Sequence, residues 1–510
     1  MSVERRWILG VALAAVLPHL VVIGNPLLHD APIAITGNEV VQRLPISQVW
    51  ERDFWGLEPR AGTPWSGSWR PLVTLTWAAQ ARTLGNAPAL YHAGDLAILG
   101  AAAALLFALL AELGTGRPPA AAAAALFAWH PAVTEAVASA VGRADLLAAA
   151  LLLAALLAQG RGRGALALAL LGASMLCKES AVSGAFVLIA LAWARGEGRR
   201  TLRFQGACLG VLAAYLLVRS ATLGGLGAVP MIAATDNPLV GAGTGARAAA
   251  ALDLLALAAR LVVAPFGLNH LYATGTIDVP RTIAALAGGT ILVSLAILAW
   301  RFRDPRVWLG AALFAFPLLP ALHVVSPAGV LFAERWLVLP LAGAACLAAW
   351  AVRKPTILAA IAVALAVPTV RRDLEWRSMD ALVASSLRAY PGTAKVWNEK
   401  GILASNAGRH DESAAAFLEA TRRAPDDPRP WFGLAGALER TGDLDGAERA
   451  WKRLLELAPA NAGALWLKVA RWQLGHGRVD AARATLEEAA RRFPNDPAVS
   501  AAAGTPSAPR

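Results

Sequence analysis

Long apolar stretches alternate with short polar segments over the first 370 residues of the chain. A helix that spans a membrane needs about 20 mainly apolar residues, and about eleven stretches approach or reach this length. The stretch 248–266 is apolar too, and we interpret it as an interfacial or re-entrant helix, because one more span would reverse the side of every later loop. The pattern predicts a polytopic helical membrane body, residues 1–370, with spanning segments near 7–24, 93–112, 119–130, 144–158, 164–177, 180–194, 203–220, 281–300, 307–324, 336–351 and 355–370.

The last 120 residues follow a different pattern. Proline recurs there at intervals of 34, 34 and 35 residues, at Pro391, Pro425, Pro459 and Pro494. Each proline closes a pattern of helix, glycine turn and second helix, and this period is the signature of tetratricopeptide repeats (TPR). We therefore expect an all-α protein. Its membrane body is followed by a linker, 371–390, a soluble α-solenoid of three repeats, 391–498, and a disordered tail, 499–510.

Composition supports a membrane class. Hydrophobic residues make up 57% of the chain and charged residues 16%, and the mean hydropathy is +0.50, which excludes an ordinary soluble protein of this size. The net charge of +12 comes from short basic clusters between apolar stretches, so we expect no nucleic-acid partner. The three cysteines, Cys177, Cys208 and Cys346, lie in apolar segments without paired spacing, which predicts core residues.

The basic clusters predict the topology, because Lys and Arg are retained on the cytoplasmic side. A cytoplasmic N-terminus and an uncleaved first helix leave loops 25–92 and 221–280 and the repeats on the exterior face. Arg371 and Arg372 then lie outside, against the rule. The high content of Ala, Gly and Arg favours a bacterial genome, and hence the inner (cytoplasmic) membrane. This topology places the following residues in the cytoplasm: Arg117, Arg161, Arg163, Arg195, Arg199, Arg200, Arg203, Arg301, Arg303, Arg306, Arg353 and Lys354.

Most other ionisable residues of the body fall at exterior helix ends or in exterior loops. Transporters tend to place such groups at the bilayer midplane, whereas an enzyme that acts on a lipid-linked substrate needs a site that faces outward. The pattern favours the enzyme. The candidate site residues are Asp30, Asp53, Arg70, His92, His130, Glu135, Arg143, Asp145, Lys178, Glu179, Glu334 and Arg335.

Several ordered segments carry a family resemblance. They are Asp53-Phe-Trp-Gly56, Trp69-Arg-Pro-Leu72, His130-Pro-Ala-Val-Thr-Glu-Ala-Val137, Gly142-Arg-Ala-Asp-Leu146, Cys177-Lys-Glu179, Asp236-Asn-Pro238 and Ala333-Glu-Arg335. With the C-terminal repeats, they resemble the transmembrane and TPR-containing protein O-mannosyltransferase family, whose membrane body is a GT-C glycosyltransferase. The resemblance covers nearly the whole chain. It implies an inverting transfer of a sugar, expected to be mannose, from a polyprenyl-phosphate donor to a hydroxyl group of exported proteins.

The chain departs from the family pattern at two places. The family carries two adjacent acids before an Ala-Ile-x-x-Asn stretch, whereas here Asp30-Ala31 precedes Ala34-Ile-Thr-Gly-Asn38. A family His, Asn and second His correspond to His92, Asp95 and Leu99. Of the two adjacent acids in the first loop, this chain therefore retains one, Asp30.

The expected chemistry assigns a role to each candidate. Asp30 accepts the proton of the attacking hydroxyl, and Glu135 is the alternative catalytic carboxylate. The departing phosphate needs cations, which we assign to Arg70, Arg143, Lys178 and Arg335. The supporting residues are Asp53, His92, His130, Asp145, Glu179 and Glu334. The histidines lack metal-ligand spacing, and the resemblance implies no divalent metal, so we expect no cofactor beyond the lipid-linked donor, which is a substrate.

Structural alternatives remain open for these residues. Asp30 could cap a loop, Arg143 and Asp145 could snorkel to the interface, and Lys178-Glu179 could hold a turn by charge. Glu334 could favour a helix N-terminus, His130 could be a satisfied polar residue at a helix end, and Asp53 could belong to an interfacial anchor.

The function is open in the same way. A second enzymatic hypothesis is transfer to a lipid or glycan, with the repeats recruiting a partner rather than the protein acceptor. A third is a non-catalytic membrane scaffold. The sugar, prenol, acceptor sequence and oligomeric state cannot be derived from the sequence.

Overall fold

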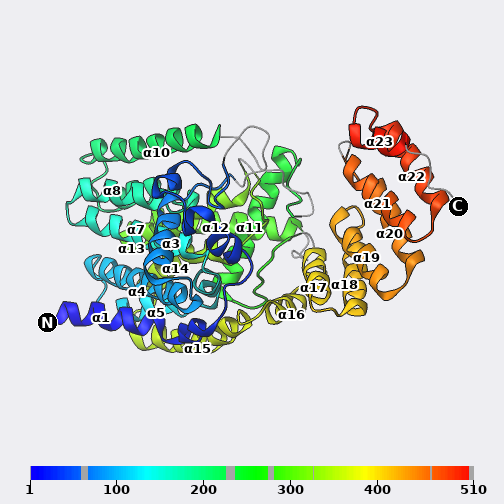
Figure 1. Cartoon of the computed structure of the whole chain (residues 1–510). Helices are drawn as coiled ribbons and strands as arrows, with labels where there is room; N and C mark the ends of the chain where they lie inside the picture. Colours follow the sequence, from blue (N-terminus) through cyan, green and yellow to red (C-terminus); the bar gives the residue numbers. More distant parts are fainter. Residues whose placement is uncertain are drawn as a thin grey trace. The chain divides into compact units, whose positions relative to one another are not determined.

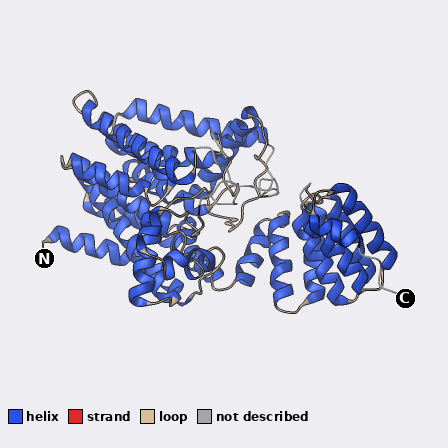
Figure 2. Cartoon of the chain, turned by 45° about the horizontal axis from the view of Figure 1, so that its top comes forward, coloured by secondary structure: helices blue, strands red, loops and turns tan. Residues whose placement is uncertain are grey.

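A computed structural model describes residues 2–58, 67–225, 236–273, 281–324, 327–459 and 462–504. These residues are mainly helical and contain no named strand, only an isolated antiparallel bridge between Tyr272 and Phe332, as Figure 2 shows. The chain forms two compact units, Met1–Tyr390 and Pro391–Arg510. The all-α fold class is confirmed.

The first unit contains sixteen α-helices among its described residues. They are α1 (Val3–Val16), α2 (Glu39–Gln42), α3 (Pro71–Leu84), α4 (Pro88–Glu112), α5 (Arg117–Ala128), α6 (Thr134–Ala138), α7 (Arg143–Gly160), α8 (Gly164–Met175), α9 (Gly184–Ala194), α10 (Leu202–Leu223), α11 (Thr244–Val263), α12 (Arg281–Phe302), α13 (Pro305–Ala315), α14 (Val338–Ala351), α15 (Pro355–Glu375) and α16 (Met379–Ala389).

Short 3₁₀ or π turns precede or extend several of these helices. They are η1 (Leu17–Gly24), η2 (Pro32–Thr36), η3 (Ile46–Trp50), η4 (Pro131–Val133), η5 (Glu179–Ser183), η6 (Phe316–Leu322) and η7 (Glu334–Leu337). The first exterior loop of the prediction, 25–92, thus contains η2, α2, η3 and α3.

The long helices pack side by side in a row. Contacts join α10 to α8, α8 to α7, α7 to α4 and α4 to α1, and Figure 1 shows these five helices one above another. Small residues allow close packing within the body. At Gly288 of α12, for example, an added Cβ would meet the backbone of Leu252 in α11 at 2.0 Å. Helix α11, predicted to be interfacial or re-entrant, therefore lies directly against α12.

Within the described residues, six helical segments are long and apolar enough to cross a membrane: Val3–Gly24, Pro88–Glu112, Arg143–Gly160, Leu202–Leu223, Thr282–Phe302 and Pro305–Leu322. Each corresponds to one of the predicted spans. The other five predicted segments fall short of these limits of length or apolarity, so the number eleven stays a prediction.

Ion pairs define two opposite ends of the body. Helix α4 begins near the start of α7, where Asp95 pairs with Arg143 at 2.5 Å. It ends at Glu112, which pairs with Arg161 after α7 at 3.1 Å and with Arg195 after α9 at 3.5 Å. Two loops predicted to be cytoplasmic therefore meet at one end, and the candidate site residues of α4 and α7 meet at the other.

Arg372, which broke the charge rule in the predicted topology, is not a free surface charge. It is buried and pairs with Glu334 at 3.3 Å and with Glu375 at 2.6 Å. Two carboxylates balance its charge inside the protein, so it carries little weight as a topological signal.

The interruption at Pro18 and His19 has a structural role. Helix α1 changes to the 3₁₀ turn η1 at Leu17, because proline removes a backbone donor. His19 is fully buried, with Nδ1 2.8 Å from Asp373 and Nε2 2.9 Å from the carbonyl of Ala128. The first segment is thereby tied to α5 and α15.

The second unit consists of paired helices, as the repeat period predicts. Its helices are α17 (Ala394–Asn406), α18 (His410–Arg423), α19 (Pro428–Thr441), α20 (Leu444–Glu456), α21 (Gly463–Gly475), α22 (Val479–Arg492) and α23 (Pro497–Gly504). One contact repeats with the period, since the indole N–H groups of Trp397 and Trp431 donate to the carbonyls of Pro391 and Pro425 at 2.8 and 2.9 Å.

The expected disordered tail is wrong for residues 499–504, which belong to α23. Pro497 lies at the helix start, and the Asp496 carboxylate accepts the backbone N–H of Ala498 at 2.9 Å and of Val499 at 3.3 Å. Val499 is fully buried in the apolar core of this unit. A helix cap and a buried valine therefore order a segment whose alanines predicted no core; residues 505–510 lie outside the described residues.

Candidate functional site

Four ion pairs gather at the end of the body opposite Glu112, and each joins residues far apart in the sequence. They are Arg70 with Glu179 at 2.9 Å, Arg143 with Asp95 at 2.5 Å, Lys178 with Asp145 at 2.9 Å, and Arg335 with Glu135 in direct contact. The structure thus brings together the four cations predicted to bind phosphate and three of the predicted acids.

The first pair connects the loop before α3 with the turn after α8. Glu179 accepts the Arg70 side chain through one oxygen and the backbone N–H of Trp69 through the other, at 2.9 and 3.0 Å. The Arg70 guanidinium also lies 4.6 Å from the ring centre of Phe54. Hydrogen bonds therefore join two of the motif segments, Trp69-Arg70 and Lys178-Glu179, directly to each other.

The central pairs act on one another electrostatically. Burial disfavours the charged form of Arg335, but the carboxylates of Glu135, Asp145 and Asp30 outweigh this effect and raise its pKa above the ordinary value. Glu135 is almost fully buried and also accepts the backbone N–H of Arg335 at 3.1 Å. The arrangement holds a partly exposed arginine over buried carboxylates.

Arg143 has a different environment from the other three cations. Its side chain is only 2% exposed, and it donates to Asp95, to the Gln80 side chain at 3.0 Å and to the Tyr91 carbonyl at 3.0 Å. These contacts tie α7 to α3 and α4. We therefore interpret Arg143 as a positioning residue, and its contact with phosphate stays a prediction.

A tight turn sets the spacing between Glu135 and Arg143. Ala140 has a left-handed backbone with φ of 51°, which is uncommon for a residue other than glycine. At Gly142 an added Cβ would lie 2.4 Å from the Cα and carbonyl oxygen of Ala136. Only glycine fits this approach without moving the backbone.

We expect Gly142→Ala to destabilise the protein by about 1–3 kcal/mol, the usual cost of overpacking, and to lower activity because α6 and α7 must separate. Thermal unfolding in detergent measures the first effect. Gly210 of α10 is the matched control, since a Cβ there meets nothing within 4 Å. If both alanine variants proved equally stable, the close approach of the two backbones would be disproved.

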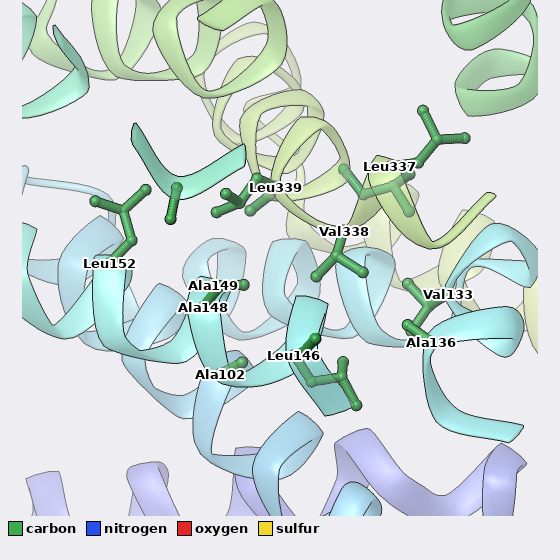
Figure 3. Packing of buried hydrophobic residues seen from close by; sticks show 14 of the residues in the cluster. Ala102, Val133, Ala136, Leu146, Ala148, Ala149, Leu152, Leu337, Val338 and Leu339 are labelled. Atoms are coloured by element: carbon green, nitrogen blue, oxygen red, sulfur yellow. The ribbon is translucent and has the colours of Figure 1, made fainter. Parts of the chain in front are cut away.

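Buried apolar residues lie next to the charged residues in the chain. Ala136 follows Glu135, Leu146 follows Asp145, and Leu337 lies two positions after Arg335; all three are fully buried. Figure 3 shows them with neighbouring core residues of α4, α7 and α14. Helices in lipid are held by close packing, and these residues belong to the apolar core that joins the helices carrying the charged side chains.

Asp30 lies just before η2 and is 32% exposed, with one carboxylate oxygen 3.1 Å from Nδ1 of His29. Its charge acts on Arg335, which places the predicted base at the edge of the charged cluster. The nearby Asn38 has a local role, because its side chain accepts the N–H of Val40 at 3.0 Å and begins α2.

The four supporting candidates Asp53, His130, Glu334 and His92 differ in their surroundings. Asp53 accepts the N–H groups of Trp55 and Leu57 at 2.9 Å and closes a turn. His130 accepts the N–H of Ala132 at 3.2 Å and lies 3.0 Å from the Val262 carbonyl.

Glu334 is buried, with the Tyr272 hydroxyl at 2.8 Å and Arg372 at 3.3 Å. His92 is buried in α4, close to backbone groups of Asn25, Pro26 and Val137. The contacts of His130 match its structural alternative, a satisfied polar residue at a helix end.

Two further residues belong to the cluster and were not among the candidates. Asp95 is fully buried and is the partner of Arg143; an acid inside an apolar segment was the signal for it. Arg219, near the end of α10, donates to the Gly67 carbonyl at 2.5 Å and its charge acts on Glu179. The sequence feature that could have identified Arg219 was its position at the exterior end of a predicted span.

Comparison with known proteins agrees with both units. Tetratricopeptide repeat family models match residues 381–428, 398–462 and 442–504. Protein O-mannosyl-transferase TMTC3 of Mus musculus is 26% identical over 450 residues, covering 78% of this chain and 49% of the relative. Protein O-mannosyl-transferase TMTC4 of Homo sapiens is 27% identical over 449 residues, covering 73% and 60%.

The chain is a homologue of the TMTC-type protein O-mannosyl-transferases. The resemblance predicted from the ordered motifs is confirmed. Protein O-mannosyl-transferase Tmtc1 of Drosophila melanogaster is 37% identical, over 180 residues that cover 34% of this chain and 21% of the relative. The chain spans about half the length of the TMTC3 relatives of mouse and human.

Proposed function

We propose that this homologue is an inverting GT-C glycosyltransferase that moves mannose from a polyprenyl-phosphate donor to serine or threonine hydroxyls of proteins. One observation carries the proposal: Arg70, Lys178 and Arg335 converge from three distant segments at one end of an apolar helical body. Cations held at the surface of a membrane body suit the phosphate of a lipid-linked sugar. The names of the relatives support mannose and a protein acceptor.

The reaction needs a base on one face of the sugar and cations on the other. The acceptor hydroxyl attacks the anomeric carbon and forms the new C–O bond, while Asp30 draws off its proton, directly or through a neighbouring side chain. The bond from the anomeric carbon to the phosphate oxygen breaks, and its electron pair stays on the departing polyprenyl phosphate. We propose that the basic side chains alone balance this charge, without a divalent metal.

The four cations are unequally accessible. The side chains of Arg335 and Arg70 are 18% and 15% exposed, those of Lys178 and Arg143 only 6% and 2%. We propose that Arg335 and Arg70 bind the phosphate first. Lys178 then adds a point charge from a more buried position, and Arg143 positions α7.

We also propose an orientation in which the site and the repeats face the exterior of the bacterial inner membrane and the N-terminus lies in the cytoplasm. The gathering of Glu112, Arg161 and Arg195 at the opposite end supports it, because loops rich in arginine stay in the cytoplasm.

Donor binding should depend on pH through Lys178. Burial lowers the pKa of Lys178 to about 8, the charge of Arg70 acts in the same direction, and Asp145 opposes both. Above pH 8 the side chain loses its charge, so the KM for the donor should rise by about tenfold between pH 7 and pH 9 if only the protonated form binds phosphate. Lys178→Arg should abolish this rise, because arginine stays charged.

Unfolding cannot imitate this effect. The folded protein binds this proton less tightly than the unfolded chain, whose lysine pKa is about 10.4, so this group increases stability as pH rises from 8 toward 10. A donor KM that stayed constant across this range would remove Lys178 from the phosphate site.

The test of the function uses purified protein in nanodiscs, radiolabelled polyprenyl-phosphate mannose, a short Ser/Thr peptide and an intact protein acceptor. We expect label on both acceptors. A chain truncated after Tyr390 should label the peptide but lose the intact protein, because the repeats raise the local concentration of the acceptor.

Each other outcome contradicts part of the proposal. Label on lipid or glycan alone would favour the alternative acceptor, and no transfer by the full chain would favour the scaffold. A folded truncated chain that is inert toward both acceptors would show that the repeats support the site rather than capture substrate.

A further inference from the structure

His29 has an unusual backbone conformation next to the predicted base. Its φ is 56°, in the left-handed region that few residues other than glycine adopt. In this conformation the imidazole contacts the following residue, with Nδ1 of His29 3.1 Å from the Asp30 carboxylate. Strained residues of this kind cluster at active sites, which makes the pair a candidate for chemistry.

The surroundings hold the His29 ring in place. His270 meets it edge to face, with ring centres 5.7 Å apart and planes at 88°. His270 is itself anchored, because its Nδ1 lies 2.6 Å from the Ser386 hydroxyl. Both members of the pair are partly exposed, His29 by 23% and Asp30 by 32%, so the pair is ordered and still reachable by an acceptor.

The chemistry of the pair differs from that of a lone carboxylate. An ordinary imidazole, with a pKa of about 6.5, is more basic than an ordinary aspartate, with a pKa of about 3.9. A proton taken up by the pair therefore comes to rest on the ring, while the carboxylate orients the ring and stabilises the imidazolium. The adjacent Ala31 is buried and apolar, so the next position in the chain supplies no second acid.

We propose that His29 is a catalytic residue that accepts the acceptor proton, with Asp30 orienting it through Nδ1. This inference rests on the proposed function. In the transfer step the hydroxyl oxygen bonds to the anomeric carbon, the hydroxyl proton passes to the imidazole, and polyprenyl phosphate leaves with the electron pair of the broken C–O bond. Release of the proton to water restores the neutral ring.

Two variants of the full chain separate a chemical role from a conformational one. His29→Gly accepts the left-handed backbone without strain and leaves room for a small base, and asparagine also tolerates this conformation. We expect both variants to keep the melting temperature and the donor KM and to lose about a hundredfold in kcat. Added imidazole should raise the rate of His29→Gly in a saturable way and leave His29→Asn unchanged.

Near-normal kcat in both variants would overturn the proposal and leave Asp30 as the only base. If His29→Gly lost kcat and added imidazole did not restore it at any concentration, the proposal that the His29 ring accepts the proton would also be rejected. The wild-type protein separates this test from the function itself: if it transfers no sugar to any acceptor, the proposed function fails and this inference falls with it.

Discussion

Replacing Asp30 with asparagine should lower kcat by about two to four powers of ten, the range for loss of a general base. The amide retains the shape of the side chain but can neither take up a proton nor stabilise a charged partner. The donor KM should change little, because the cations that bind phosphate keep their own carboxylate partners. Single-turnover transfer from the lipid-linked donor to a Ser/Thr peptide measures the effect.

Glu39→Gln is the matched control for this substitution. Glu39 lies nearby in α2, is exposed and pairs with Arg43, so loss of its charge should leave turnover within about twofold, because exposed pairs contribute little. A folded Asp30→Asn protein with near-normal turnover would exclude Asp30 both as the base and as the partner that orients His29, and it would make Glu135 the next candidate for the base.

Arg143→Met should destabilise the body by about 3–5 kcal/mol, because it leaves a buried charge without its partner. Asp95 is fully buried and Arg143 nearly so, and the substitution also removes the donors to Gln80 and to the Tyr91 carbonyl. Denaturant or thermal unfolding in detergent measures the loss. Activity should fall with the folded fraction, since Arg143 holds α7 in place.

The double variant Asp95→Leu/Arg143→Met tests the reason for the loss. Replacing both charges with apolar groups should recover most of the stability, because the penalty comes from the unpaired acid. The exposed Arg43 offers the comparison, and Arg43→Ala should cost less than about 1 kcal/mol. A stable Arg143→Met protein with a raised donor KM would instead place Arg143 on the phosphate, as the motif predicted.

Several features of this protein follow from local patterns in the chain. The 34-residue period predicts the helix pairs of the second unit, because each repeat forms from contacts between neighbouring segments. Apolar length predicts the long helices, which satisfy their own backbone hydrogen bonds. The ordered motifs identify the family, and the clustering of charge at helix ends locates the candidate site at one end of the body.

The pairing of those charges depends on tertiary structure. Lys178 meets Asp145 and Arg335 meets Glu135 across 33 and 200 positions of the chain, and no local pattern specifies such partners. Burial separates accessible Arg335 from enclosed Arg143, although both are arginines beside acids in the sequence. The left-handed turn at His29 and the helix α23 were missed for the same reason: side-chain packing and distant contacts outweigh the local preferences that sequence patterns report.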